Sequence, residues 1–215
     1  MAGHGQFCAV ARAHEAVGGR WTLLVVRELL SGARRFNDIR RGIPRLSRTM
    51  LAERLEALQA LGCVARQADG YALTEAGLEL APVITALGHW GQRRLVREIL
   101  AEDLDLEPVL IDMQRRVRAE ALPPQPLVVR FDLASHPPRF LLLSAREVAL
   151  CRRNPGFPEP LRLHGPLAAL AAWWRGDASF AAAQRMGLAL EGPRGLARAF
   201  PGWFARYAFA EVAPA

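Results

Sequence analysis

The chain has 215 residues, 51% of them hydrophobic, and a formal net charge of +7, from 28 arginines against 21 acidic residues. This length fits one large domain or two small ones, and the apolar content excludes a disordered chain. No apolar run approaches the ~18 to 20 residues that span a bilayer, and the N-terminus lacks the pattern of a signal peptide, so we expect a cytoplasmic protein with no membrane partner.

The residue types that carry catalysis or bind metals are scattered along the sequence. Cys8, Cys63 and Cys151 are odd in number and far apart, with neither metal-ligand spacing nor a disulfide framework. This usage fits a reducing compartment. There is no Ser-His-acid arrangement, phosphate-binding glycine loop or paired-histidine motif. We therefore expect no catalytic residues, no metal and no cofactor, and a protein that is not an enzyme.

The chain begins with two predicted helices. The first covers residues 7–17 and ends at Gly18-Gly19, and the second covers residues 21–30 and stops at Ser31-Gly32. The second helix is largely apolar. We expect it to supply the floor of the first domain's core, through Trp21, Leu24, Val25 and the Leu29 region.

A helix-turn-helix is predicted next. Its first helix starts at Phe36, with Asn37 as the N-cap, and closes at Gly42. Residues 43–46 form the turn, and Ser47 caps the second helix. The second helix carries a stripe at helical spacing, made of Leu51, Leu55, Leu58 and the terminal Gly62.

A hairpin follows the second helix. Residues 63–67 and 71–73 flank Ala68-Asp69-Gly70, and an Asp-Gly pair is a strong signal for a tight turn. Helix, turn, helix and hairpin together describe a winged helix. The second helix of such a domain can enter the major groove of DNA.

Positive charge is concentrated on this predicted unit. Between residues 34 and 54 only Asp38 and Glu53 oppose seven arginines, namely Arg34, Arg35, Arg40, Arg41, Arg45, Arg48 and Arg54. A solvated helix face is the plain interpretation of such a run. Combined with the helix spacing and the hairpin, the run favours binding to the phosphates of double-stranded DNA.

A long helical pattern begins at Thr74, its predicted N-cap, and contains Pro82, which kinks or restarts a helix. Its apolar stripe extends beyond the residues that could pack on the winged-helix domain itself. The stripe consists of Val83, Ile84, Leu87, Trp90, Gly91, Leu95 and Ile99. Such a stripe usually packs on a partner, so we expect a dimer helix. Packing on the following domain is the alternative.

The pattern changes after residue 100. Residues 101–108 are acidic and mark a boundary, residues 109–118 predict a connecting helix, and the proline-rich residues 122–126 stiffen the chain. The segment 127–133 alternates with period two, which predicts a strand with one buried face. Further strands are expected at 140–143, 147–151, 161–164 and 187–191, and helices at 166–176, 180–185 and from Pro193 to Pro201. Strands grouped first and helices later suggest an α+β domain.

Several segments of the first half share their order with a known family. They are residues 8–13, 17–24, 34–39, 46–51, 54–58, 71–77, 82–83 and 87–91. In these segments the chain resembles the HxlR family of bacterial transcriptional regulators. The resemblance implies a winged-helix homodimer on a pseudo-palindromic operator, with paired recognition helices in successive major grooves.

The resemblance also assigns DNA contacts to Ser47, Arg48 and Thr49, at the start of the second helix. A helix start attracts phosphate through free N–H groups and the helix dipole, and side chains of its first turn reach base edges.

Four more arginine or amide side chains are candidates for DNA contacts. Arg35 and Asn37, at the start of the preceding helix, are expected to contact the DNA backbone, as is Arg66 in the wing. Arg54 lies at the edge of the buried stripe. It either touches DNA or braces the domain through an ion pair.

Cys8 matches the N-terminal cysteine with which some members of this family sense electrophiles or oxidants, although Ala9 stands in place of the usual proline. Positive charge from Arg12, one turn later, would favour a thiolate. The alternative is that Cys8 is a small buried apolar residue. We favour this alternative for Cys8 and for the other two cysteines.

The second half is similar to a domain of the sterol carrier protein type two kind, in residues 173–177, 190–194 and Phe200-Pro201. The resemblance implies a curved sheet and helices around an apolar tunnel for lipids or other apolar molecules. Trp173, Trp174, Trp203 and Phe204 are first of all core residues, and some would line the tunnel. No ligand-binding residue can be assigned.

The sequence therefore predicts three parts: residues 1–100 as an N-terminal winged helix-turn-helix domain for DNA binding and dimerisation, residues 101–126 as a linker with a connecting helix, and residues 127–215 as a C-terminal α+β sterol-carrier-like domain. We expect a homodimeric regulator, a repressor, whose second domain binds an apolar small-molecule effector. The alternatives are a lipid-binding protein dimerised through its N-terminal half and a thiol-based sensor acting through Cys8.

Overall fold

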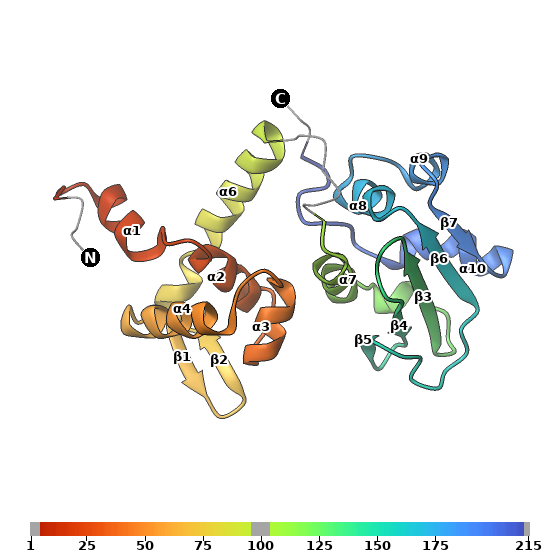
Figure 1. Cartoon of the computed structure of the whole chain (residues 1–215), viewed down its shortest axis with the longest axis horizontal. Helices are drawn as coiled ribbons and strands as arrows, with labels where there is room; N and C mark the ends of the chain where they lie inside the picture. Colours follow the sequence, from red (N-terminus) through yellow and green to blue (C-terminus); the bar gives the residue numbers. More distant parts are fainter. Residues whose placement is uncertain (1–4, 96–103, 213–215) are drawn as a thin grey trace. The chain divides into compact units, whose positions relative to one another are not determined.

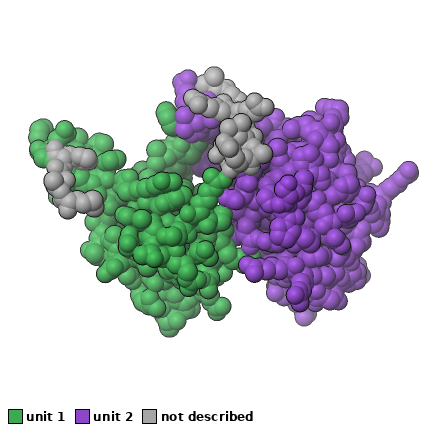
Figure 2. Space-filling view, viewed as in Figure 1, with its two compact units in different colours: residues 1–90 green, residues 91–215 purple. Residues whose placement is uncertain are grey.

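The computed structural model describes residues 5–95 and 104–212, and the chain forms two compact units, unit 1 (residues 1–90) and unit 2 (residues 91–215) (Figures 1 and 2). Unit 1 is mainly helical with one hairpin, and unit 2 is a mixed α+β structure (Figure 1). Both classes agree with the sequence predictions.

Unit 1 contains the expected helix-turn-helix and wing. Its elements are α1 (Ala9–Val17), α2 (Thr22–Leu30), α3 (Phe36–Gly42), α4 (Arg48–Ala60), β1 (Val64–Gln67), β2 (Gly70–Leu73), α5 (Glu75–Leu78) and α6 (Ala81–Arg94), the last of which ends beyond the boundary of the unit. Strands β1 and β2 are antiparallel, with Gln67 opposite Gly70. The predicted interruption near Pro82 is real, because α5 ends at Leu78 and a new helix starts at Ala81.

Side-chain caps fix two helix starts in unit 1. The Ser47 hydroxyl accepts the N–H of Met50 at 3.1 Å, and Thr74 accepts the N–H of Gly77 at 3.2 Å, so both predicted caps are confirmed. Each cap satisfies an N–H group that the helix itself leaves unpaired.

The predicted cap of α3 is wrong. Asn37 lies inside the helix, because the N–H groups of Asp38 and Ile39 already donate to the carbonyl of Arg35, at 2.9 and 3.1 Å. Arg35 is the N-cap, in the extended region and without a side-chain cap bond. Gly42 is likewise the last helical residue, not the one after the helix.

The core of unit 1 lies between α2, α3, α4 and β1. It contains Val25, Val26, Leu29, Ile39, Leu51, Leu55, Leu58 and Val64. Val25 and Leu29 are buried as expected, but Leu24 is exposed, because α2 turns the face of Val25, Val26 and Leu29 inward.

Unit 2 is built on one mixed sheet with strand order β5-β4-β3-β6-β7. Its elements are α7 (Leu106–Arg115), η2 (Ala119–Ala121), β3 (Leu127–Leu133), β4 (Arg139–Leu143), β5 (Val148–Cys151), β6 (Leu161–Gly165), α8 (Leu167–Arg175), α9 (Phe180–Arg185), β7 (Ala189–Glu191), α10 (Arg194–Ala199) and η3 (Phe200–Trp203). The central pair β3–β6 is parallel, and the other pairs are antiparallel. The strand and helix positions expected from the sequence agree with these bounds within a few residues.

Helix α7 belongs to the core of unit 2. Leu106, Leu110 and Met113 are buried in the same cluster as the inward side chains of β3 and α8. Gln114 also donates to the carbonyl of Val148 in β5, at 2.9 Å. The stretch expected to be a linker, residues 101–126, therefore contains a helix that holds the sheet of unit 2, because its apolar face needs that sheet to be buried.

Strand β3 is buried on both faces over its first half, not on one. Leu127, Val129, Phe131 and Leu133 face the helices, as the alternation predicts, but Val128 is also buried, with Phe140 and Leu142 of β4 on the opposite face. The expected polar face begins only at Arg130. There Asp132 pairs with both Arg130 and Arg162, so these charges stabilise neighbouring strands.

An aromatic cluster fills the interior of unit 2. Trp173, Trp174, Phe200, Trp203 and Phe204 are each at most 3% exposed. Most of their ring pairs lie edge to face at short distances, for example 5.3 Å between the centroids of Phe200 and Phe204, an arrangement favoured for buried aromatic pairs. The expectation that these residues are core is confirmed.

Candidate nucleic-acid interface

The first turn of α4 is the centre of the candidate interface. Ser47, Arg48 and Thr49 are all exposed, as the sequence predicted. The Ser47 hydroxyl uses a lone pair to cap the helix, but its proton remains available for donation. The N–H groups of a first helical turn have no partner within the helix and attract negative charge. This face can therefore approach a phosphate and present Arg48 and Thr49 beside it.

Arg48 connects the two helices of the helix-turn-helix. Its guanidinium lies 5.3 Å from the ring centroid of Phe36, and its Nη1 is 3.4 Å from Oδ1 of Asn37, the latter a long and weak hydrogen bond. The structure thus brings Asn37 and Arg48 together, as two candidates on one surface. Phe36 was missed in the sequence, although its place one residue before Asn37 put it at the start of α3. Stacking on a ring limits the conformations of an exposed arginine.

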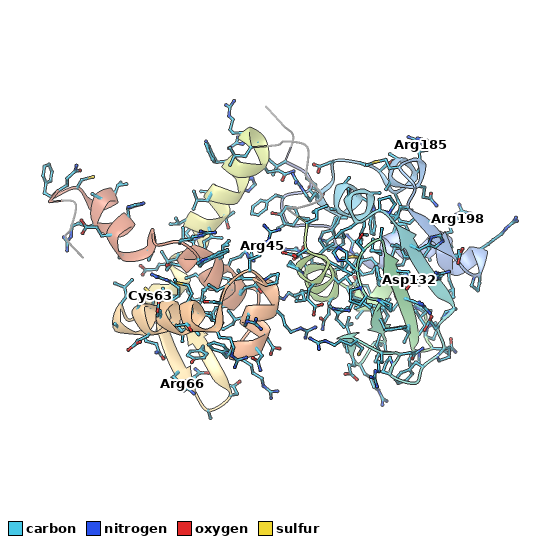
Figure 3. The ribbon with its side chains drawn as sticks, viewed as in Figure 1. Arg45, Cys63, Arg66, Asp132, Arg185 and Arg198 are labelled. Atoms are coloured by element: carbon cyan, nitrogen blue, oxygen red, sulfur yellow. The ribbon has the colours of Figure 1, made fainter. Side chains whose placement is uncertain are left out.

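The wing presents Arg66 on β1 (Figure 3). Its Nη1 donates to the Tyr71 hydroxyl at 2.8 Å, and its guanidinium lies 5.2 Å from the Tyr71 ring centroid. Arg66 and Tyr71 are directly opposite in the hairpin register. The hairpin register that follows from the Asp-Gly turn could therefore have identified Tyr71 as the residue that holds Arg66 in place.

The wing is also attached to the segment before α3. The N–H of Tyr71 donates to the carbonyl of Arg34 at 2.9 Å, and Gly70, at φ +141°, passes so close that a Cβ there would overlap this carbonyl. Only glycine tolerates both the backbone angle and the approach. Arg35, the next residue, is exposed at the N-cap of α3. The backbone at Arg34 therefore positions both the wing and the start of α3.

Arg54 contacts the body of unit 1. Its guanidinium nitrogens lie 3.3 Å from the sulfur of Met50, and Nη2 is 4.0 Å from the Glu53 carboxylate. The same side chain lies close to Gly19, between α1 and α2. These contacts favour the bracing alternative over a DNA contact for this residue.

A buried carboxylate fixes α3 against α2. Glu28 is 2% exposed and pairs with Nη2 of Arg27 at 2.7 Å, and that nitrogen lies 3.4 Å from the Gly42 carbonyl. Gly42 packs directly on the Glu28 carboxylate, and a Cβ at this position would overlap it. The sequence interpretation treated α2 as plain apolar core and missed this pair. The sequence feature that could have revealed this pair is an acidic residue within an otherwise apolar helix.

Comparison with known proteins identifies the helix-turn-helix unit. The family model described as HxlR-like helix-turn-helix matches residues 16–99. A Methanothermobacter thermautotrophicus protein, named as an uncharacterized HTH-type transcriptional regulator, is 35% identical over 92 residues, which are 40% of this chain and 70% of that protein. The chain belongs to the HxlR family.

Other relatives named as HTH-type transcriptional regulators match part of this chain. The regulator YvaP of Bacillus subtilis is 35% identical over 86 residues, 37% of this chain and 80% of its own length. A Mycobacterium tuberculosis relative, MT3179, is 43% identical over 98 residues, but the match covers only 60% of its length and 41% of this chain. Both are named as uncharacterized HTH-type transcriptional regulators.

Solved structures match this HxlR-type unit as well. Quinone-bound YodB from B. subtilis shares 38% identity, with 38% of this chain and 93% of that chain covered and a TM-score of 0.36. The redox regulator HypR in its reduced form shares 32% identity, with 40% and 91% covered and a TM-score of 0.37.

The cysteines of this HxlR-family chain differ in environment. Cys8 is exposed at the N-cap of α1, so the expectation that it is a buried apolar residue is wrong. Hydrogen bonds from the backbone N–H groups of Ala11 and Val10 lower the pKa of its thiol, and the source is the helix start, not Arg12 as expected. Cys63 is buried, and burial, followed by the charge of Glu79, raises the pKa of its thiol.

The described part of the chain adds neither a metal site nor a membrane span to this interface. Residues 5–95 and 104–212 contain no group of three or more His, Cys, Asp or Glu side chains placed to hold a metal ion. Within those same residues, no helix has the length and apolar character needed to cross a membrane.

Proposed function

We propose that this chain is a transcriptional regulator that binds double-stranded DNA through unit 1. The observation that carries the proposal is the exposed first turn of α4, with Arg48 stacked on Phe36 beside Asn37. A basic surface at the start of the second helix of a helix-turn-helix suits a helix that enters the major groove. The family relationship supports the same role.

The proposed contacts fall into two groups. Arg48 and Thr49 reach base edges, while the α4 start, with Ser47, binds a phosphate. Arg35, Asn37 and the wing residue Arg66 bind the phosphates on either side. Arg54 holds α4 on the body of unit 1. It supports the interface by positioning α4 and does not contact DNA itself.

The proposed regulator is a homodimer formed through α6. Apolar side chains of this helix are open to solvent: Leu87 is 49% exposed and Trp90 53% exposed, with Val83 similar, and Leu95, one residue past the helix, continues the row. Ile84 instead packs on the core of unit 1, and Ile99 lies outside the described residues. We propose that this exposed row is buried against a second copy and that the two α4 helices then lie about one duplex turn, roughly 34 Å, apart. A pseudo-palindromic operator follows from that symmetry.

Unit 2 is proposed to have a sterol-carrier-like architecture and to sense a small apolar effector. The effector would shift the dimer between operator-binding and operator-free states, and the regulator would act as a repressor. This coupling requires the effector to bind the two states with different affinity.

A lipid-binding protein that uses unit 1 only for dimerisation is the alternative. It gives no reason for the five surplus positive charges between residues 34 and 54. Selection of bound fragments from random duplex DNA tests the two functions against each other. The regulator enriches an inverted repeat, whereas the lipid-binding protein enriches no sequence.

A second candidate function is thiol sensing through Cys8. The specific observation in its favour is an exposed thiol with a lowered pKa at the start of α1. An oxidant or electrophile would modify this thiol and change operator affinity. A Cys8→Ser variant that keeps the full response to oxidants excludes this role.

A further inference from the structure

A groove of about 670 Å³ lies entirely within unit 2, at the segment that follows α7 and the C-terminal segment. It is lined by parts of residues 116–118, 173–180 and 201–211. Its volume lies within the range of about 300 to 1,000 Å³ that is usual for small-molecule sites.

Two backbone connections shape the groove. The residues after α7 pair with those after η3: Arg118 donates to the Trp203 carbonyl and Ala205 to the Arg116 carbonyl, both at 2.8 Å. This pairing places Arg116 and Arg118 on one edge. The segment 207–211 also lines the groove and lies against the end of α8. Gly176, at φ +88°, packs so closely on Ala210 that a Cβ would overlap its carbonyl oxygen.

The floor of the groove is aromatic. Trp173 and Phe204 are each 2% exposed, with ring centroids 6.4 Å apart in an edge-to-face arrangement. Phe180 packs its ring 5.0 Å from Trp173 and remains half-buried, as do Pro201 and Tyr207 at the sides. A flat apolar group can therefore rest on a rigid surface of rings.

The rim of the groove is basic. Arg116, Arg118 and Arg206 line it, and Glu211 is the one acidic lining residue in the part of the chain that the structure describes. Arg116 is held by Asp112, with Nε 3.0 Å from Oδ1. Among the described residues, none forms an ion pair or hydrogen bond with the side chains of Arg118 or Arg206. Two exposed guanidinium groups beside an apolar floor suit one anionic group, because arginine binds a carboxylate through two parallel hydrogen bonds.

We propose that this groove binds a compact aromatic carboxylate, with its ring on Phe180, Pro201 and Tyr207 and its carboxylate on Arg118 and Arg206. The occupant is aromatic because the floor offers ring faces and edges, which favour an offset or edge-on partner over a long flexible chain. The inference deepens the effector function proposed above. It narrows that effector to an apolar ring that carries one carboxylate, bound in an open groove.

Calorimetric titration of the full chain with four probes tests the assignment. The probes are phenylbutyrate, its neutral counterpart phenylbutanol, decanoate and decanol. We expect phenylbutyrate to bind at least about tenfold more tightly than phenylbutanol, the discrimination of a charge-assisted hydrogen-bond pair. Decanoate is expected to bind more weakly than phenylbutyrate. Equal binding of acid and alcohol, tighter binding of decanoate, or no binding of phenylbutyrate below about 1 mM would overturn the proposal.

Two variants locate the binding site. A combined Arg118→Gln and Arg206→Gln variant changes only exposed side chains and is expected to lose the tenfold preference for the acid. Arg198→Gln is the matched control, because Arg198, on α10 (Figure 3), lines a neighbouring hollow that shares Phe180 and Pro201 with the groove. Equal loss in both variants, or no loss in the double variant, contradicts the assignment.

The two proposals fail in different ways. Binding of phenylbutyrate at the arginines without any change in operator affinity leaves the groove assignment standing and removes the effector coupling. Normal operator binding with no discrimination between acid and alcohol removes the groove assignment and leaves the DNA-binding function standing.

Discussion

The guanidinium of Arg48 lies 5.3 Å from the centroid of the Phe36 ring, so the first turn of α4 is tied to the start of α3 through a cation–π contact. Exposed contacts of this kind are worth about 0.5 to 1 kcal/mol. The contact orients an arginine that the Asn37 amide also approaches. The α4 start is therefore preorganised for DNA before DNA is present.

Replacement of Arg48 tests this preorganised contact. Arg48→Ala should weaken operator binding by about 1 to 3 kcal/mol and relax the preference at one base position, if this side chain reads a base edge. Fluorescence anisotropy with the operator and with single-base variants measures both effects. Arg185→Ala, which removes the same charge in unit 2, is the control and should leave the affinity close to wild type. A uniform loss across all sequences would instead assign Arg48 to a phosphate.

Ser47 allows stability and DNA binding to be separated. Ser47→Ala removes the cap on the Met50 N–H and should destabilise unit 1 by about 1 kcal/mol. Ser47→Asp keeps a capping oxygen and should keep stability, but it places a negative charge where a phosphate is proposed to bind. We expect Ser47→Asp to fold like wild type in urea titrations and to lose operator affinity at least about tenfold. Unchanged affinity of the Ser47→Asp variant would show that no phosphate binds at the α4 start.

Gly42 is predicted to be intolerant of any side chain. Gly42→Ala forces a Cβ into the Glu28 carboxylate, so α3 or the Arg27–Glu28 pair must move. The expected loss of stability is about 1 to 3 kcal/mol, and hydrogen exchange of α3 amides reports it separately from unit 2. Gly195→Ala, in α10 where a Cβ meets nothing within 4 Å, is the matched control and should be neutral or slightly stabilising. Equal effects of both alanines would contradict the close packing at Glu28.

The two unit 1 cysteines should differ in reactivity and in pH dependence. The thiolate is the reactive form, so the lowered pKa of Cys8 gives more thiolate at neutral pH and the raised pKa of Cys63 gives less. Cys8 is also exposed, whereas Cys63 is buried. Iodoacetamide at neutral pH should therefore label Cys8 first, with a half-maximal pH below that of a free cysteine. Mass spectrometry of the labelled peptides measures this, and faster labelling of Cys63 would contradict the structure.

Local sequence signals were sufficient for the helix-turn-helix. Ser47 and Thr74 have hydroxyls that cap, Pro82 interrupts a helix, and the Leu51 stripe has a helical period, so each acts through its immediate neighbours. The α3 start could not be read in this way. Its cap is a backbone carbonyl of Arg35, and arginine has no side-chain signal for that role.

The remaining features depend on contacts between distant segments. The exposure of Cys8, the burial of Val128 on a second face and the membership of α7 in unit 2 follow from which elements pack together. The groove forms where the Val117–Phe204 bridge brings the residues near Arg116 beside those near Phe204, and no local sequence pattern predicts this pairing. The sequence could identify the aromatic residues of the core, but not the surface they support.

The salt dependence of operator binding tests the central claim most directly. A dimer in which Arg35 and Arg66 of each copy contact phosphates neutralises about four phosphates, so log K against log salt should fall with a slope of about −3.6. The paired Arg35→Gln and Arg66→Gln variant should make the slope shallower by about 1 for each phosphate that the dimer no longer neutralises. A slope near zero, or one unchanged in this variant, would contradict the account that unit 1 binds DNA through the arginines around α4.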